Sequence, residues 1–105
     1  MKEVNINIIK ANLYTPYKNK NTLISLEDSP HWLFLNGNEY FYEYYIYFAK
    51  QPEHSVDIFR KLIKEFNFDN YPPIIINKEY IIQDGFHRAC IIKHKGFTTI
   101  KTIIS

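Results

Sequence analysis

The sequence has little of several things on which small proteins often depend. Its 105 residues include one cysteine, Cys90, and three glycines. A single cysteine forms no internal disulfide and builds no cysteine-based zinc site. No run of about 18 apolar residues is present, which argues against a membrane-spanning helix, and the first residues lack the basic and then apolar form of a secretory signal. We therefore expect a cytoplasmic protein in a reducing compartment.

The sequence also has little excess of one sign of charge over the other. Thirteen Lys and Arg against eleven Asp and Glu leave a formal net charge of +2. Dedicated nucleic-acid binders concentrate basic residues in one stripe, so we expect DNA binding to be weak or absent. Aromatic residues, in contrast, are abundant at 17%, and the apolar share of 46% is ordinary for a folded chain. A chain of this length predicts one domain that covers residues 1–105.

Local patterns predict an α+β fold, with about four strands and with helices packed against the sheet. Ser29-Pro30 is typical of a helix start, Gly37 and Gly96 are typical of helix ends, and runs rich in β-branched residues are typical of strands. The expected elements are a strand at 4–9, a loop at 12–21, helices at 30–35 and 39–50, a helix that opens at 52–53, strands at 74–76 and 80–83, a helix at 86–95 and a strand at 98–104.

The segment around Asp84 carries the strongest chemical signal. A strand runs into the turn Asp84-Gly85 and then into a helix whose first turn holds His87 and Arg88. Free amides at a helix start attract anions, glycine lets a phosphate approach the backbone, and an arginine fork matches phosphate oxygens. These residues predict a phosphate site. The same pattern also fits a plain strand-to-helix turn capped by Asp84, with solvated basic residues.

The segment from Tyr40 to Phe48 is aromatic on every side of its expected helix. A domain of this size cannot bury all of these rings, so some would meet a ligand, a protein partner or another subunit of a homo-oligomer. A thick core with tyrosine hydroxyls at the surface is the other interpretation, and the sequence leaves both open. One nearby basic residue, Lys50, is too little for a platform that stacks single-stranded nucleic acid.

Residues from about 52 to 104 resemble the ParB/sulfiredoxin superfamily, which includes the ParB-like nuclease domain. The resemblance rests on a proline-led strand, a hairpin, a D-G-x-H-R motif, a helix that ends at Lys-Gly and a final strand. In this sequence the first four features are Pro73–Ile76, Tyr80–Ile82, Asp84–Arg88 and Lys95-Gly96. The first strand also fits. Residues 12–51 depart from the usual pattern and resemble an insertion, whose aromatic helical part is expected at about 30–50.

The resemblance implies a set of nucleotide-phosphate contacts, namely Asp84, Gly85, His87 and Arg88. The motif is closest to that of the free-serine kinases, which move a phosphate from a nucleotide to a small hydroxyl. Their base is a carboxylate near the start of the preceding helix, where this chain has Glu53. Glu53 and His87 are thus the catalytic candidates, and His54 is either a further phosphate contact or simply an exposed residue. Glu53 also suits the first turn of a helix for dipole reasons alone, and Glu39 and Glu43 are reserve carboxylates.

Other branches of the superfamily fit less well. Sulfiredoxins carry a catalytic cysteine where this chain has Phe86, and Cys90 is expected to be a small buried hydrophobe instead. In partition proteins, a helix-turn-helix domain follows this domain. We do not expect one in this protein, because the sequence reaches Ser105 directly after the last expected strand. Neither sulfinic acid reduction nor sequence-specific DNA recognition is therefore expected.

We expect a nucleotide- or phosphate-binding domain that acts as a phosphotransferase, a kinase for a small hydroxylated acceptor. The expected cofactor is ATP, ADP or CTP, alone or with Mg²⁺ carried by the nucleotide. The four histidines are spread along the sequence, so no protein-ligated metal is expected. One alternative is a non-catalytic nucleotide or nucleic-acid binding module of the ParB partition or nuclease type. Another is a degenerate domain kept for protein contacts.

Overall fold

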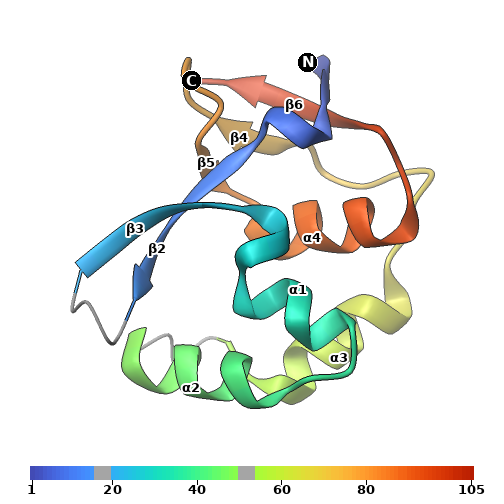
Figure 1. Cartoon of the computed structure of the whole chain (residues 1–105). Helices are drawn as coiled ribbons and strands as arrows, with labels where there is room; N and C mark the ends of the chain where they lie inside the picture. The colour runs from blue at the N-terminus through green and yellow to red at the C-terminus, as the bar shows by residue number, and fades with distance from the viewer. Residues whose placement is uncertain (16–19, 50–53) are drawn as a thin grey trace.

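The computed structural model describes residues 1–15, 20–49 and 54–105. It confirms the α+β class, with a four-stranded sheet, a separate hairpin and four α-helices in the described ranges. Figure 1 shows the sheet at one end of the molecule, α4 (Phe86–Lys95) and α1 (Pro30–Leu35) in the middle, and α2 (Tyr40–Ala49) and α3 (Val56–Glu65) at the other end. None of the described helices is long and apolar enough to cross a bilayer.

The main sheet has the strand order β1-β6-β4-β5. Its strands are β1 (Lys2–Asn5), β4 (Ile74–Ile76), β5 (Ile82–Asp84) and β6 (Thr99–Ile104). The central pair β4 and β6 is parallel, whereas β1 on β6 and β5 on β4 are antiparallel. Because α4 connects β5 to β6, the helix begins where β5 ends, at one edge of the sheet. The four strands of the main sheet are those predicted from the sequence, with shifted ends.

The N-terminal part differs from the expected strand at 4–9 and loop at 12–21. β1 ends at Asn5, a 3₁₀ turn covers Ile6–Ile8, and β2 (Lys10–Thr15) then pairs with β3 (Lys20–Ser25) as a hairpin. The Asn5 side chain accepts a hydrogen bond from the Asn7 backbone at 2.9 Å, which starts the turn. Ile6 and Ile9 are both buried and Ile8 is exposed, so the buried residues follow a spacing of three that no regular strand would give.

The helices follow their local signals. Ser29 caps α1, its Oγ accepting from the Trp32 backbone at 3.0 Å, and α4 ends at Gly96, whose φ is +110°. The expected opening of the third helix at 52–53 needs correction, because Ser55 is extended and its Oγ caps Ile58 at 3.1 Å, so that α3 begins at Val56. Residues 50–53 lie outside the described residues. The expected return strand at 80–83 begins later, at Ile82, since Tyr80 has φ +64°.

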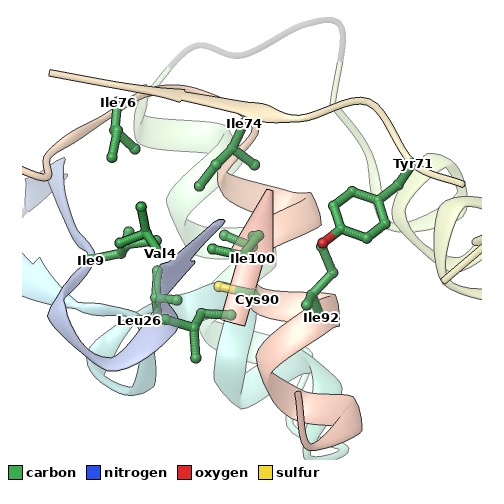
Figure 2. Packing of buried hydrophobic residues seen from close by; sticks show 11 residues of the cluster. Val4, Ile9, Leu26, Tyr71, Ile74, Ile76, Cys90, Ile92 and Ile100 are labelled. Carbon is green, nitrogen blue, oxygen red and sulfur yellow. The ribbon is translucent and has the colours of Figure 1, made fainter. Parts of the chain in front are cut away.

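The core lies between the sheet and α4, as Figure 2 shows. Its members are Val4, Ile6, Ile9, Leu26, Tyr71, Ile74, Ile76, Ala89, Cys90, Ile92 and Ile100. Cys90 is fully buried there, which confirms its expected role as a small hydrophobe, and burial raises the pKa of its thiol to about 12. A second cluster of Phe34, Tyr42, Phe59 and Ile91 joins α1, α2 and α3 to the other side of α4. The helix α4 thus holds both clusters together.

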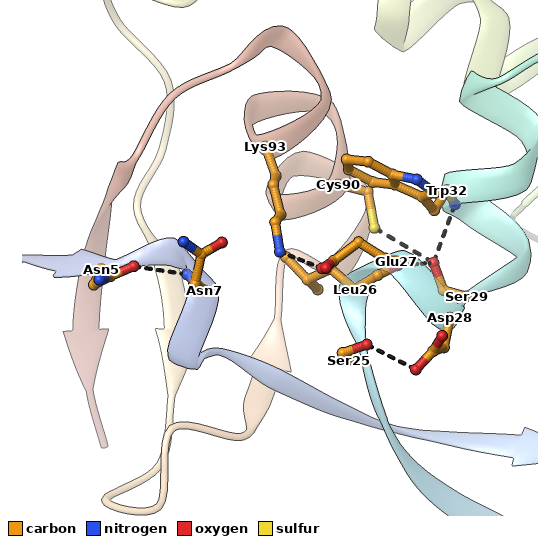
Figure 3. Close-up of polar contacts among 10 residues, drawn as sticks. All are labelled: Asn5, Asn7, Ser25, Leu26, Glu27, Asp28, Ser29, Trp32, Cys90 and Lys93. Carbon is orange, nitrogen blue, oxygen red and sulfur yellow. Dashed lines mark hydrogen bonds and ion pairs between the residues drawn. The ribbon is translucent and has the colours of Figure 1, made fainter.

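Polar contacts fix α1 and the 3₁₀ turn before it, Leu26–Asp28, against α4 (Figure 3). Ser29 is fully buried, donates to the Leu26 carbonyl at 2.7 Å and lies 3.7 Å from the Cys90 sulfur. Lys93 of α4 pairs with Glu27, and this hydrogen bond lowers the pKa of that carboxyl. These contacts set the position of α1, and with it the position of His31, relative to the start of α4.

Candidate functional site

The start of α4 is built around a glycine that the geometry requires. Gly85 follows β5 with φ +99° and ψ 27°, and it offers no capping side chain to the first amides of α4. A Cβ at this position would lie 2.6 Å from Cγ2 of Ile74 and 2.9 Å from Nη2 of Arg88. The chain therefore approaches β4 and the arginine as closely as only glycine allows. What results is a helix start whose amides carry partial positive charge.

Arg88 lies beside these amides with donors to spare. Its Nη2 donates to the Pro73 carbonyl at 3.3 Å and lies 3.9 Å from Oδ2 of Asp84. Its Nε is buried and has no hydrogen-bond partner in the described part of the chain. The side chain is 23% exposed, whereas that of Asp84 is 68% exposed and solvated. The arginine is thus anchored by a carbonyl, while part of its fork remains available to an anion.

The helix start opens into a cleft of about 650 Å³. Ligand sites in proteins commonly have volumes of about 300–1,000 Å³, so the cleft is large enough for a ligand of many atoms. Its walls come from β2, α1, α2, α3, β5 and α4. Rings form much of the lining, and the polar part consists of amides, two carboxylates, Arg88 and three histidines. The aromatic members are Tyr42, Tyr45, Phe59, Phe66, Tyr71 and Phe86, the amides are Asn12, Asn67, Asn70 and Gln83, and the carboxylates are Glu65 and Asp84.

Three of the four histidines meet in this cleft. The ring of His87 has its centroid 4.4 Å from that of His31 and 4.4 Å from that of His54. Tyr42 fixes the cluster, because its hydroxyl lies 2.9 Å from Nε2 of His87. Both His31 and His54 have a buried Nδ1 without a hydrogen-bond partner among the described residues. Every buried polar side-chain atom found without a partner in those residues, including Nε of Arg88, belongs to a residue that lines the cleft.

Burial keeps two of these rings, His31 and His87, uncharged at neutral pH. It lowers the pKa of His87 to about 3, with smaller contributions from His54 and Arg88. It also lowers the pKa of His31 well below its usual value, and His87 and His54 lower this pKa further by smaller amounts. Burial raises the pKa of Tyr42, so its hydroxyl stays protonated and is able to donate to His87. At neutral pH His87 therefore offers a neutral imidazole, and its charge does not vary with pH in the physiological range.

The structure brings together most of the residues predicted for the site. One turn at the start of α4 contains Asp84, Gly85, His87 and Arg88, and His54 lies against the His87 ring. Glu53, the predicted base, lies outside the described residues. The reserve carboxylates are elsewhere: Glu39 pairs with Arg60, and Glu43 is exposed on α2.

Sequence reasoning missed His31, Tyr42 and Glu65. His31 is buried at 1% exposure and packs edge-on against the His87 ring, at 75°. Tyr42 lies 45 residues before its partner His87. No local pattern marks either contact, because both arise only when α1 and α2 pack onto α4.

The described residues contain no group of three or more His, Cys, Asp or Glu side chains placed to hold a metal ion. The His87 ring makes an angle of 75° with the His31 ring and of 58° with the His54 ring. Comparisons with protein-family models, with curated proteins and with solved structures find no match to this chain.

Proposed function

We propose that the protein binds a nucleotide or a related phosphorylated small molecule in the cleft, with phosphate against the first turn of α4. The observation that carries this proposal is the combination of uncapped amides after Gly85 with the anchored guanidinium of Arg88. Amides at a helix start and a charged fork recognise the same oxyanion from two sides. Asp84, 3.9 Å from Arg88, is placed to orient the guanidinium or to hold Mg²⁺ carried by the phosphates.

The rest of the cleft supports a ligand larger than phosphate. Aromatic walls offer flat apolar surface to a base or another ring, and the side-chain amides at the rim offer donors and acceptors to its polar edge. The unpartnered nitrogens on His31, His54 and Arg88 favour a ligand that supplies hydrogen bonds, because buried polar atoms are normally paired. A nucleotide has both kinds of group.

Transfer of the phosphate to a small hydroxylated acceptor is the activity that we propose for this site. An alcohol must lose its proton as it attacks phosphorus, so a base is needed. A histidine whose pKa is about 3 is a weak base, so His87 serves as a neutral hydrogen-bonding contact. The base is then a carboxylate: Glu53 by resemblance to the free-serine kinases, or Glu65, which lines the cleft.

Binding without transfer is the second candidate function. It is supported by the scarcity of carboxylates, since the described lining holds Glu65 and Asp84, and Asp84 already faces Arg88. A nucleic-acid ligand is less favoured, because Arg88 is the one Lys or Arg residue in the described lining, whereas grooves for single strands pair rings with several basic side chains.

Titration calorimetry with ATP, ADP and CTP, each with and without Mg²⁺, tests binding. Arg88→Ala should weaken the affinity by roughly tenfold or more, since a charge-assisted hydrogen bond contributes about 1.5–3 kcal/mol. Arg88→Lys should recover part of the loss, because an ammonium lacks the bidentate fork. The matched control is Arg60→Ala, which removes an exposed arginine that pairs with Glu39 outside the lining. Equal affinity in Arg88→Ala and wild type would contradict the proposal.

Incubation with labelled nucleotide and a set of hydroxylated amino acids and polyols then separates the two candidates. A phosphorylated acceptor supports transfer, and nucleotide binding without any product supports the binding domain. Retention of duplex DNA at physiological salt, without nucleotide binding, would overturn both in favour of a nucleic-acid module.

A further inference from the structure

The outer side of α2 carries a continuous row of exposed rings. This aromatic stripe consists of Tyr40, Phe41, Tyr44, Tyr47 and Phe48, which are 66%, 48%, 43%, 77% and 41% exposed. The rings touch in sequence along the helix, with centroids 5.4 Å apart for Tyr40 and Phe41, 6.3 Å for Tyr40 and Tyr44, and 4.4 Å for Tyr44 and Phe48. They form one patch rather than scattered surface residues.

The inner side of α2 is already used. Tyr42 is fully buried and Tyr45 is 9% exposed, and Tyr42 packs with Phe34 and Phe59 of the second cluster. The helix is therefore apolar on nearly all sides, a pattern that normally belongs to a helix covered on all sides. Figure 1 places α2 at the end of the molecule away from the main sheet. A contiguous exposed apolar patch of this kind marks a contact surface.

The spacing of the stripe identifies the partner. Its members lie three and four residues before and after Tyr44, so the pattern reads the same in both directions along the helix. An antiparallel copy of the same helix, rotated about a two-fold axis at Tyr44, would place Tyr40 opposite Phe48 of the second copy. It would also place Phe41 opposite Tyr47. A two-fold interface requires such a self-complementary patch.

The size of the stripe suits the same partner. At roughly 200 Å² for a whole aromatic side chain, the exposed fractions amount to on the order of 500 Å² on each copy. Two copies would bury about 1,000 Å² of ring surface, which reaches the lower range of specific protein interfaces. The expected dimer is weak and depends on concentration.

Charge argues against a lipid surface as the occupant. Helices that lie in a membrane interface carry Lys and Arg on their polar side, and α2 contains none. Its one charged residue, Glu43, is exposed beside the stripe, and its charge acts on Arg60 of the same copy. The pKa of Arg60 is raised first by its hydrogen bond to Glu39 and also by Asp57 and Glu43.

We propose that the aromatic stripe is the interface of a two-fold homodimer in which α2 packs antiparallel on α2 of a second copy.

Sedimentation equilibrium from about 1 µM to about 1 mM covers the affinity expected for such an interface. Wild type should change from monomer to dimer across this range. Tyr44→Arg places two like charges at the axis and should weaken the dimer by roughly tenfold or more. Leu23→Arg is the matched control, because it adds the same charge at an exposed apolar residue of β3. An equimolar mixture of Tyr44→Arg and Tyr44→Glu should dimerise again, which also shows that both variants are folded.

Disulfide trapping tests the antiparallel arrangement. The single native cysteine, Cys90, is fully buried and does not interfere. Under mild oxidation Tyr44→Cys should cross-link to itself, and Tyr40→Cys should cross-link to Phe48→Cys when the two are mixed. Tyr40→Cys alone should cross-link slowly, since its two copies would be separated along the helices by about 12 Å, or eight residues at 1.5 Å each.

Three results would overturn the proposal. One is a wild type that stays monomeric over the whole concentration range. Another is a dimer that Tyr44→Arg and Leu23→Arg weaken equally. The third is flotation of wild type, but not of Tyr44→Arg, with vesicles of phosphatidylcholine and phosphatidylserine, together with a monomer in solution, which would assign the stripe to lipid.

Discussion

Replacing Gly85 by alanine tests whether the start of α4 depends on a residue without a side chain. Its left-handed φ of +99° costs an ordinary residue about 1–2 kcal/mol. An added Cβ would also lie 2.6 Å from Cγ2 of Ile74, which is fully buried in β4. Overpacking of this kind costs about 1–3 kcal/mol, because core atoms must shift. Gly85→Ala should therefore lower the free energy of unfolding by roughly 2–5 kcal/mol.

The other two glycines separate the backbone cost from the overlap. Gly37 and Gly96 also have positive φ, at +96° and +110°, but a Cβ at either meets nothing within 4 Å. Gly96→Ala should thus lose only the backbone part, about 1–2 kcal/mol. Urea denaturation followed by far-ultraviolet circular dichroism measures both variants. Equal losses in Gly85→Ala and Gly96→Ala would refute the close approach of Gly85 to β4.

The same variant has an expected effect on the site. The added Cβ would lie 2.9 Å from Nη2 of Arg88, so the guanidinium must move away from the helix start. Phosphate affinity should fall in Gly85→Ala and stay near the wild-type value in Gly96→Ala, at a temperature where both are folded. A loss of stability without a loss of affinity would mean that Arg88 does not contact the ligand from its present position.

Two further predictions concern pH and catalysis. Because burial holds the pKa of His87 near 3 and that of His31 well below 6.5, the unfolded chain binds more protons than the folded one on acidification. His87 should then remove about 2 kcal/mol of stability between pH 7 and pH 5, and His31 acts in the same direction. Urea titrations should show a shallower loss in His87→Gln than in wild type, whereas no loss in wild type would contradict the burial of neutral His31 and His87. Glu53→Gln should lower phosphotransfer by about 10²–10⁴-fold with little change in nucleotide affinity, measured against Glu39→Gln as the control, and unchanged turnover would move the base role to Glu65.

The elements that the sequence predicted well have signals within a few residues. α1 starts where Ser29 caps the Trp32 amide, and α4 ends where Gly96 takes a left-handed conformation. Such signals act through local hydrogen bonds and backbone preference, so they survive without any knowledge of packing. For this reason the predicted bounds of the helices at 30–35 and about 86–95 agree with the structure.

The hairpin of β2 and β3 could not be predicted in the same way. Its strands contain many Asn, Thr and Lys residues, and Leu23 on β3 is 52% exposed. Backbone hydrogen bonds pair the two strands along their length, so no strong apolar alternation is needed to hold them. The segment 12–21 was interpreted as a loop because its composition is polar. Polar composition indicates that a segment is exposed, but it does not tell whether its backbone pairs with another strand.

The candidate site likewise has a local part, which the sequence predicts, and a part that forms only through packing. The turn from Asp84 to Arg88 is local, and its grouping follows from the strand-turn-helix pattern alone. His31 and Tyr42 reach His87 only through packing of α1 and α2 against α4, and Tyr42 precedes His87 by 45 residues, too far for a local pattern to link them. A sequence pattern thus locates the anion-binding turn but leaves out the walls that would select the rest of the ligand.

The burial of Cys90 gives this chain a built-in reporter of its own opening. The sulfur lies in the core between the sheet and α4 and has no solvent exposure (Figure 2). With a thiol pKa of about 12, almost no thiolate exists at neutral pH in the closed state. Thiol-reactive reagents therefore label Cys90 only when α4 separates from the sheet. The rate at which the single thiol is labelled therefore measures how often the core opens. Because α4 also holds the phosphate turn at its first residues, a ligand bound there would slow that labelling in proportion to its affinity.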